Sequence, residues 1–346
     1  MTCNPEQLLR LLSRTIPAHL PTLTLGAPGT GKSALHEQAA KAAGYEYKVL
    51  YPALLDPVDM GGLPIPIGDG DNRRVKRLLD DTLLMLCKSK LPTLLLLDEL
   101  GQASPAMQAA CAPLMLVREI GGHRLPENIT ITAATNRRSD RSGATAILTH
   151  LISRMSTVVE LKSDIGSWTV WATKAKIRPE IISYIRWRPS LLHQYDAEAA
   201  WNGTTPYPCP RSWENASMLL EAGLDQEVER IALDGCVGEG AATELITHIR
   251  LARNNISADE ILAAPEKFQL PKSIGEQYAI VSALAHYATA DKYAALLDIA
   301  DILSKKSKEL SAMLLRDALN IHPGIHLTPE WMRAMSGPLG SMILGA

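Results

Sequence analysis

The sequence has no excess of charge of either sign, no long apolar run and no paired cysteine motif. Its 346 residues include 35 lysines and arginines against 37 aspartates and glutamates, a formal net charge of −2. Such a chain lacks the basic footprint of a dedicated nucleic-acid-binding protein, although a local basic patch remains compatible with it. The five cysteines are odd in number and include no C-x-x-C pair. They therefore favour neither a disulfide framework nor a zinc module, and they indicate a reducing compartment.

The apolar runs are short. The longest, at 94–97, ends in Asp98 and Glu99, whereas a membrane-spanning helix needs roughly 20 apolar residues. The N-terminal residues show no basic region followed by an apolar core, so no signal peptide is expected. We therefore expect a cytoplasmic protein that does not engage a membrane. At ~150 residues per domain the length predicts two or three domains.

The first half of the chain alternates short β-like runs with helical patterns, which is typical of a three-layer α/β domain. Asn4 and Pro5 are suited to begin a first helix. Five strands are expected, at 22–26, 45–51, 93–97, 128–135 and 157–161.

After Lys162 the β pattern disappears and helical patterns follow. Helices are expected at 166–176, 179–186, 212–222, 226–233 and 241–253, with a Pro-rich loop at 202–210. The segment 278–303 has a strong 3.6-residue periodicity. We expect three domains, which comprise residues 1–161, 162–255 and 256–346.

A phosphate-binding motif follows the first expected strand. Residues 26–33 match G-x-x-x-x-G-K-[ST] between a strand and a helical pattern, which is the context that the motif requires. The glycines let the backbone curl so that successive N–H groups converge on phosphate oxygens, and the following helix adds its positive end. We expect Lys32 to bridge the β- and γ-phosphates of a nucleotide and the Ser33 hydroxyl to ligate Mg²⁺. The predicted nucleotide-binding residues are Gly26, Ala27, Pro28, Gly29, Thr30, Gly31, Lys32, Ser33 and Ala34.

Two further strands end in polar residues. Asp98 and Glu99 follow the third expected strand, at the edge where α/β sheets bind ligands. Asp98 is suited to hold Mg²⁺, and Glu99 to orient or deprotonate the water that attacks the γ-phosphate. In an arbitrary protein the two carboxylates could merely end a strand, but the phosphate loop upstream favours the catalytic interpretation. Asn136, which ends the fourth strand, could position the attacking water or serve as a turn residue.

Together these motifs resemble those of AAA+ ATPases, and several details resemble the MoxR branch of that family. In this resemblance 26–33 corresponds to Walker A, 94–99 to Walker B and Asn136 to sensor 1. The resemblance implies an α/β nucleotide-binding domain with strand order 5-1-4-3-2, an α-helical lid and a helical C-terminal region. It also implies ATP and Mg²⁺ as cofactors.

Two segments favour the MoxR branch. Residues 55–64 resemble the family's pore-facing D-x-x-D-hydrophobic-G segment, with Met60 at the pore position, and 118–126 resemble its helix-2 insert hairpin. Asp140 to Gly143 also fit this branch. The resemblance implies a homo-oligomeric ring, usually a hexamer, and a partner protein with a von Willebrand A domain.

The same resemblance implies roles for two arginines. Arg154 lies in a Ser-Arg-Met segment that resembles the arginine finger, and Arg211 follows Pro210 as sensor 2 does. A structural salt bridge is the alternative for Arg154. Arg137, Arg138 and Arg141 crowd the sensor-1 loop, where they face either a neighbouring subunit or solvent.

Other candidates have structural explanations. His322 and His326 have i,i+4 spacing, but Pro323 and Gly324 prevent the helix that a metal pair needs. Trp168 and Trp171 are better explained by packing than by base stacking. The one basic-aromatic cluster suited to nucleic acid comprises Tyr184, Arg186, Trp187 and Arg188, with packing of a lid face as the alternative.

The resulting hypothesis is an Mg²⁺-dependent ATPase ring that remodels or activates a partner protein in the manner of a chaperone. A nucleic-acid-associated AAA+ motor or loader is the alternative, which the neutral charge does not favour. A non-hydrolysing nucleotide-gated scaffold is disfavoured by the intact polar residues of the site.

Overall fold

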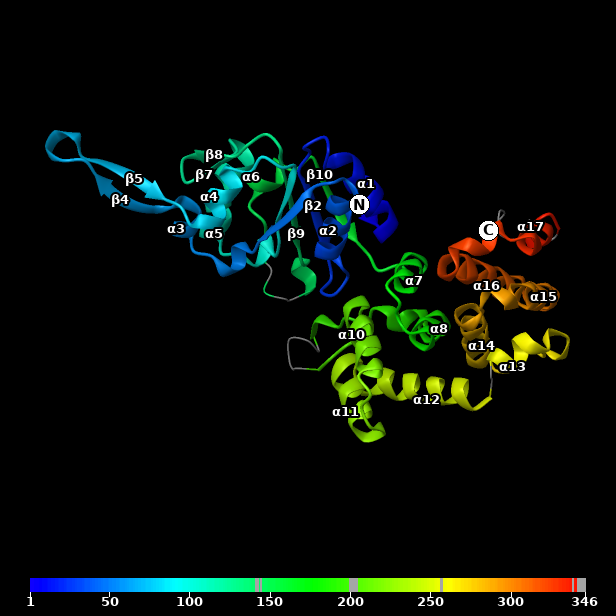
Figure 1. The fold of residues 1–346 in the computed structure, drawn as a ribbon. Helices are drawn as coiled ribbons and strands as arrows, with labels where there is room; N and C mark the ends of the chain where they lie inside the picture. Colours follow the sequence, from blue (N-terminus) through cyan, green and yellow to red (C-terminus); the bar gives the residue numbers. More distant parts are fainter. Residues whose placement is uncertain (141–142, 144, 199–204, 256–257, 338, 341–346) are drawn as a thin grey trace. The chain divides into compact units, whose positions relative to one another are not determined.

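The computed structural model describes residues 1–140, 143, 145–198, 205–255, 258–337 and 339–340. The chain divides into two compact units (Figure 1). Unit 1 comprises Met1–Asp164 with Tyr195–Thr204, and unit 2 comprises Ile165–Gln194 with Thr205–Ala346. The further division near residue 255 stays a prediction.

Unit 1 is built on a six-stranded parallel sheet with the order β1-β10-β2-β9-β6-β3. Its strands are β1 (Thr2–Cys3), β2 (Thr22–Gly26), β3 (Glu46–Leu50), β6 (Thr93–Leu97), β9 (Ile129–Thr135) and β10 (Thr157–Leu161). Five of them correspond to the predicted strands, so the order 5-1-4-3-2 is confirmed. The two-residue β1 at the edge was not predicted.

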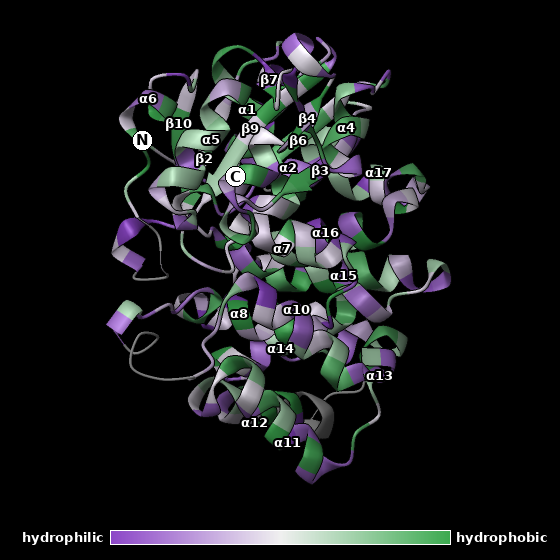
Figure 2. Cartoon of the chain, turned by 90° about the vertical axis from the view of Figure 1, so that its left-hand side faces the viewer, coloured by the Kyte–Doolittle hydropathy of each residue, from purple (hydrophilic) through white to green (hydrophobic). Residues whose placement is uncertain are grey.

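Helices cover both faces of the sheet because successive strand residues point to opposite sides. Leu94 packs with α1 (Pro5–Thr15) and α2 (Lys32–Ala42). Leu95 and Leu97 pack on the other face with α4 (Asp81–Cys87), α5 (Pro105–Leu116) and α6 (Thr149–Ile152). In Figure 2 the central strands β6 and β9 lie among the hydrophobic, green parts of this unit. The predicted three-layer α/β fold is thereby confirmed.

The first helix begins where the sequence predicts. Asn4 accepts a hydrogen bond from the Gln7 backbone N–H, and the Gln7 side chain accepts one from the Asn4 N–H. This reciprocal capping box satisfies two N–H groups that a helix start otherwise leaves without partners.

Two antiparallel hairpins lie outside the main sheet. The longer one pairs β4 (Leu63–Ile67) with β5 (Arg74–Leu78), after the short helix α3 (Pro57–Gly61), and extends away from the body of unit 1 (Figure 1). The shorter one pairs β7 (Glu119–Ile120) with β8 (His123–Arg124). The shorter hairpin falls within the segment 118–126 in which a hairpin was expected. The longer hairpin was not predicted.

The described part of unit 2 is helical. Its helices up to residue 255 are α7 (Ile165–Lys174), α8 (Pro179–Trp187), α10 (Pro210–Glu221), α11 (Gln226–Val237) and α12 (Glu239–Asn255). They share a core that includes the fully buried Trp213. A second core is formed by α13 (Ala258–Ala263), α14 (Ile274–Tyr287), α15 (Tyr293–Ser304), α16 (Lys308–Ile321) and α17 (Pro329–Met335).

Helix α14 joins the two cores of unit 2 by packing against α8. The Ser282 hydroxyl donates a hydrogen bond to the Pro179 carbonyl oxygen at 3.3 Å. Gly275 lies against the Trp187 ring, so closely that an added Cβ would be 3.4 Å from three ring atoms. The helices on either side of residue 255 therefore form one packed body.

None of the helices in the described ranges is long and apolar enough to cross a membrane.

Candidate nucleotide site

The phosphate-binding motif forms the loop between β2 and α2. Gly29 and Gly31 have φ angles of 77° and 87°, a left-handed region that side chains rarely adopt. The Thr30 hydroxyl donates to the Ala27 carbonyl at 2.9 Å, which closes the turn. Gly31 is the N-cap of α2, and no side chain caps that end. The first N–H groups of α2 are therefore directed into the loop, as an anion site requires.

Lys32 lies at the centre of this loop. Its side chain is buried, and its Nζ donates to the Gly26 and Ala27 carbonyls at 2.9 and 3.1 Å. The same Nζ donates to Asn136 Oδ1 at 2.8 Å. Because β2 and β9 are adjacent parallel strands, their ends bring two residues 104 positions apart into contact. The structure thus brings the predicted Walker A lysine and the predicted sensor 1 together.

Ser33 and Asp98 form the second contact between the motifs. The Ser33 hydroxyl donates to Asp98 Oδ2 at 2.5 Å, and Asp98 is only 6% exposed. Hydroxyl and carboxylate oxygens are the ligands that Mg²⁺ prefers in proteins. The donor set at this point therefore fits the metal that the sequence implies, with Ser33 and Asp98 as the residues that would hold it.

Tyr47 on β3 was missed by the sequence analysis because a tyrosine in a strand is usually a core residue. Its hydroxyl donates to the Ser33 carbonyl at 3.1 Å. Burial and the nearby negative charge of Asp98 raise the pKa of Tyr47, so the phenol stays neutral and can donate. Tyr47 thus fixes the backbone next to the hydroxyl that is predicted to bind Mg²⁺.

Glu99 adopts an unusual backbone conformation. Its φ of 56° is left-handed, which costs a residue with a side chain of order 1–3 kcal/mol. Its backbone N–H donates to Asp98 Oδ1 at 3.0 Å. The side chain is exposed at the carboxyl edge of the sheet, next to the buried Asp98. This placement leaves the carboxylate available to a water molecule.

The three arginines of the sensor-1 loop differ in their surroundings. Arg137 pairs with the buried Asp140 at 2.7 Å and with Glu160 on β10 at 3.0 Å. These hydrogen bonds raise the pKa of Arg137. They explain the position of its side chain without a contact to solvent or to a neighbouring subunit. Arg138 is exposed. Arg141 lies outside the described residues.

Arg154 follows α6 and precedes β10. Its side chain is exposed and forms no ion pair or hydrogen bond with any described residue. The alternative of a structural salt bridge therefore finds no support in the described part of the chain. Arg211 lies in the first turn of α10, in unit 2, and is also exposed. The functions of both arginines remain predictions.

The basic-aromatic cluster of α8 is packed. Tyr184 is fully buried, and Arg186 forms an ion pair with the buried Asp317 of α16. Arg188 stacks on Trp187 and bridges to Glu244 at 3.0 Å. These contacts favour the packing alternative over an open surface for nucleic acid.

Two other side chains, Trp168 and His322, also have structural explanations. Trp168 is 5% exposed and belongs to the core of unit 2, which confirms its packing role. His322 Nε2 lies 3.0 Å from the Ala285 carbonyl oxygen. No cluster of three potential metal ligands occurs among the described histidines, cysteines and carboxylates.

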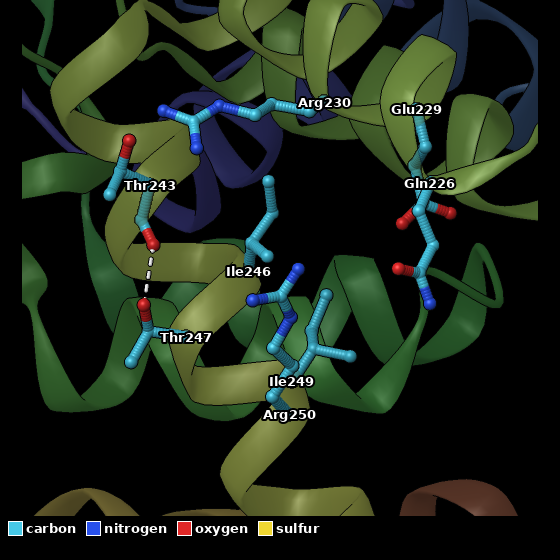
Figure 3. A pocket seen from close by; sticks show the side chains of 8 residues that line it. All are labelled: Gln226, Glu229, Arg230, Thr243, Ile246, Thr247, Ile249 and Arg250. Carbon is cyan, nitrogen blue, oxygen red and sulfur yellow. Dashed lines mark hydrogen bonds between the residues drawn. The ribbon is translucent and has the colours of Figure 1, made fainter.

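A hollow of about 310 Å³ lies between α11 and α12 in unit 2 (Figure 3). Arg230, Arg250 and Glu229 line it together with Ile246 and Ile249. None of the predicted site residues lines this hollow, which is separate from the phosphate loop in sequence and in unit.

The fold and the loop define a P-loop nucleotide-binding domain of the α/β class. Residues 22–163 match the family described as "ATPase family associated with various cellular activities (AAA)". The matched segment includes five of the six strands of the main sheet, the phosphate loop, Asp98, Asn136 and Arg154.

Solved structures with a similar chain path include the RuvB Holliday junction branch migration motor of Thermotoga maritima. It is 14% identical with a TM-score of 0.39, over 81% of this chain and 80% of that chain. NtrX of Brucella abortus in complex with ADP is 15% identical with a TM-score of 0.39, over 91% and 68% of the two chains. A putative ATPase of Cytophaga hutchinsonii is 14% identical with a TM-score of 0.33, over 90% and 88%. Likeness at this level bears on neither the activity nor the partners of this chain. No curated protein matches the sequence.

Proposed function

We propose that this protein is an Mg²⁺-dependent ATPase that converts ATP and water to ADP and phosphate. The observation that carries the proposal is the convergence of Lys32, Asn136, Ser33 and Asp98 at the carboxyl edge of one parallel sheet. Three sequence motifs from distant parts of the chain meet there, within hydrogen-bonding distance. Catalysis of phosphoryl transfer depends chiefly on positioning and on neutralising charge, and these residue types supply both.

Each side chain has a part in this reaction. Lys32 neutralises charge on the β- and γ-phosphates, while the loop N–H groups bind their oxygens. Ser33 and Asp98 would hold Mg²⁺, which would supply Lewis-acid stabilisation of the phosphate oxygens. Glu99 accepts a proton from, or orients, the attacking water, and Asn136 helps to place it. Arg154 of a neighbouring subunit and Arg211 stabilise the charge that develops on the transferred group.

We further propose that the protein works as a homo-oligomeric ring of the MoxR type, most simply a hexamer, which remodels or activates a partner with a von Willebrand A domain. The sequence of 55–64, the hairpin in 118–126 and the exposed Arg154 support this proposal. Residues 162–255 would serve as the lid and 256–346 as a helical extension of it.

Two variants test the ATPase. Lys32→Ala deletes the charge that binds the phosphates, so nucleotide binding should be lost. Glu99→Gln should retain binding and lose turnover, since the amide cannot take a proton. Binding is measured with a fluorescent ATP analogue and turnover by phosphate release. Lys41→Ala is the control, because Lys41 is an exposed lysine on the same helix.

Two results would contradict the assignment. The first is a nucleotide affinity of Lys32→Ala within about threefold of wild type, because loss of a charged phosphate contact should weaken binding more than that. The second is hydrolysis by Glu99→Gln at the wild-type rate.

One observation favours the alternative of a nucleic-acid-associated motor. Four basic residues follow one another closely on and before β5, all exposed: Arg73, Arg74, Lys76 and Arg77. A gel shift at increasing salt tests this alternative, because phosphate contacts weaken steeply as salt rises. Arg74→Ser/Lys76→Ser should then abolish the shift, while Lys88→Ser/Lys90→Ser, at exposed positions outside the hairpin, should not. The absence of any shift in the wild-type protein would leave the remodelling ring.

A further inference from the structure

Gln108 is a fully buried polar side chain outside the predicted site. It lies on α5, where its Nε2 donates to the Ala103 carbonyl and to the Thr145 hydroxyl, both at 3.2 Å. Its Oε1 accepts a hydrogen bond from the Leu148 N–H at 3.0 Å. Both N–H donors and the oxygen of the amide are therefore used, which a buried glutamine requires.

The partners fix the orientation of the amide. A backbone N–H can only donate, so the atom facing Leu148 is the oxygen; a carbonyl oxygen can only accept, so the atom facing Ala103 is the nitrogen. Neither a methionine nor a glutamate could make the same three bonds.

The three bonded segments lead to three different parts of the nucleotide site. Ala103 ends the short 3-10 turn Leu100–Gln102 that follows Glu99. Thr145 belongs to the loop that follows Asn136. Leu148 is the N-cap of α6, and α6 leads directly to Arg154. One side chain thus connects the turn after Glu99 to the helix that directly precedes Arg154.

Gly101 strengthens this connection. Its carbonyl oxygen accepts hydrogen bonds from the Thr145 N–H and hydroxyl, at 2.6 and 3.0 Å. Its N–H donates to the hydroxyl of Thr135, the residue before Asn136, at 3.1 Å. An added Cβ on Gly101 would lie 2.6 Å from that hydroxyl oxygen, so only glycine permits the approach. The turn after Glu99 is therefore bonded both to the end of β9 and to the loop before α6.

We propose that Gln108 is a positioning residue. It couples the position of the arginine finger of one subunit to the position of the Glu99 turn in that same subunit. The inference rests on the proposed function, in which Arg154 acts on the nucleotide of a neighbour. A change at the Glu99 turn is transmitted through Ala103 and Gln108 to the N-terminus of α6. Each subunit's own site thus controls the arginine that it offers to the next one.

The test uses Gln108→Met, which conserves volume and removes all three bonds. Turnover should fall on the order of 10²-fold, as for a catalytic group displaced by about 1 Å, with ATP affinity within about twofold. The decisive measurement mixes Gln108→Met with Lys32→Ala. In mixed rings an intact finger from Lys32→Ala serves the intact nucleotide site of Gln108→Met. Turnover per Gln108→Met subunit should therefore rise toward about half of the wild-type value in random equimolar rings, where half of the neighbours carry the intact finger.

Matched variants separate positioning from general destabilisation. Thr132→Val removes a buried hydroxyl of β9 that has no hydrogen-bond partner among the described residues, and it should leave turnover unchanged. Thr145→Val removes part of the same network at an exposed position and should show a weaker form of the Gln108→Met effect, even if the latter folds poorly. Arg154→Ala mixed with Lys32→Ala is the positive control for rescue in trans.

Hydrogen exchange provides a readout that does not depend on activity. In Gln108→Met the amides of 145–155 should exchange faster, while those of 32–42 should be unchanged. Unchanged exchange in 145–155 would overturn the proposal even if the wild-type protein proved not to hydrolyse ATP. Wild-type turnover in Gln108→Met would overturn it too. So would rescue of Arg154→Ala without rescue of Gln108→Met, because Gln108 would then act only within its own site.

Discussion

At the scale of single residues, Asp98 uses both of its carboxylate oxygens. Oδ2 accepts from Ser33, and Oδ1 accepts from the Glu99 N–H. In Asp98→Asn one oxygen becomes an N–H₂ group, which cannot accept and carries no charge to attract a cation. The Mg²⁺ concentration for half-maximal turnover should rise by about tenfold or more. A rise of this size corresponds to the loss of roughly one charged hydrogen-bonding contact.

The measurement is a magnesium titration of phosphate release at saturating ATP. Asp80→Asn is the control, because Asp80 caps α4, and asparagine caps a helix as well as aspartate does. Overlapping magnesium titrations for Asp98→Asn and wild type would remove Asp98 from the metal site.

His36 on α2 gives a prediction about pH. It is fully buried, and burial lowers its pKa to about 4. In the unfolded chain histidine has a pKa of ~6.5. Because the pKa of His36 is lower in the folded state, the stability that His36 contributes is present above pH ~6.5. This stability is lost as the pH falls toward 4, because only the unfolded state then takes up the proton. Between pH 7 and pH 5 this costs about 2 kcal/mol.

Urea unfolding at pH 7 and pH 5 measures this loss. His36→Gln can still bond to the Thr24 hydroxyl, the partner of His36 Nε2 at 3.0 Å, but does not titrate. The acid-dependent loss should therefore be smaller in this variant by about 2 kcal/mol. His150→Gln, on the exposed part of α6, controls for the residue type. An equal loss in wild type and His36→Gln would show that His36 is not the titrating group.

At the scale of elements, the ion pair between Arg186 on α8 and Asp317 on α16 predicts how strongly the two cores of unit 2 depend on each other. Arg186 Nη2 donates to Asp317 Oδ1 at 2.6 Å, and the two side chains are 15% and 5% exposed. Asp317→Leu leaves the arginine without its counter-charge and should lower the free energy of unfolding by about 3 kcal/mol. The double variant Arg186→Met/Asp317→Leu removes both charges and should recover most of that loss.

Guanidinium unfolding of the three proteins checks this prediction. A double variant as unstable as Asp317→Leu would mean that the packing of the two positions, rather than their charges, joins α8 to α16.

The sequence predicted the elements whose signals are local. Asn4 and Pro5 begin α1 as expected, and the strand predicted at 93–97 forms β6, which contains the apolar run 94–97. The hairpin of β4 and β5 was missed because Pro64 and Pro66 argue against a strand. A proline is tolerated in a strand where its missing N–H would face away from the paired strand, and the two-residue spacing gives Pro64 and Pro66 the same orientation. Periodicity alone gives no indication of which side is paired.

In the candidate site, the motif residues could be predicted because their spacing is fixed by one loop or one strand end. Tyr47 and Gln108 could not, because each acts through tertiary contacts between segments far apart in sequence. The partner of Arg137 shows the same limit: Glu160 lies 23 residues away on β10, which β2 separates from β9. Which arginine is structural and which is exposed depends on pairing across the sheet.

At the scale of the whole molecule, Arg154 tests whether the protein acts as a ring. Its exposed guanidinium is free of described partners in its own chain, so its effect should be exerted on another subunit. Arg154→Ala should leave ATP affinity nearly unchanged and reduce turnover strongly, since such an arginine can be worth ~10³–10⁵ in rate. Mixing it with Lys32→Ala should partly restore phosphate release, because some interfaces then combine an intact Lys32 with an intact Arg154.

Analytical ultracentrifugation shows whether the rings are mixed. An Arg154 that acts within its own chain gives no rescue, because no single subunit in the mixture holds both groups. Full activity of a protein that sediments only as a monomer would discard the ring mechanism.

The prolines of β4 have a consequence for the hairpin that extends from unit 1. A free strand edge offers a row of N–H and C=O groups to which a strand of another molecule can add. On β4 the N–H groups that would face outward belong to positions 64 and 66, and proline has no N–H. An added strand would therefore find no N–H donor at these two positions, even though the hairpin exposes Leu63 and Leu78. The backbone of β4 thus makes its own edge of the ribbon a poor template for edge-to-edge aggregation.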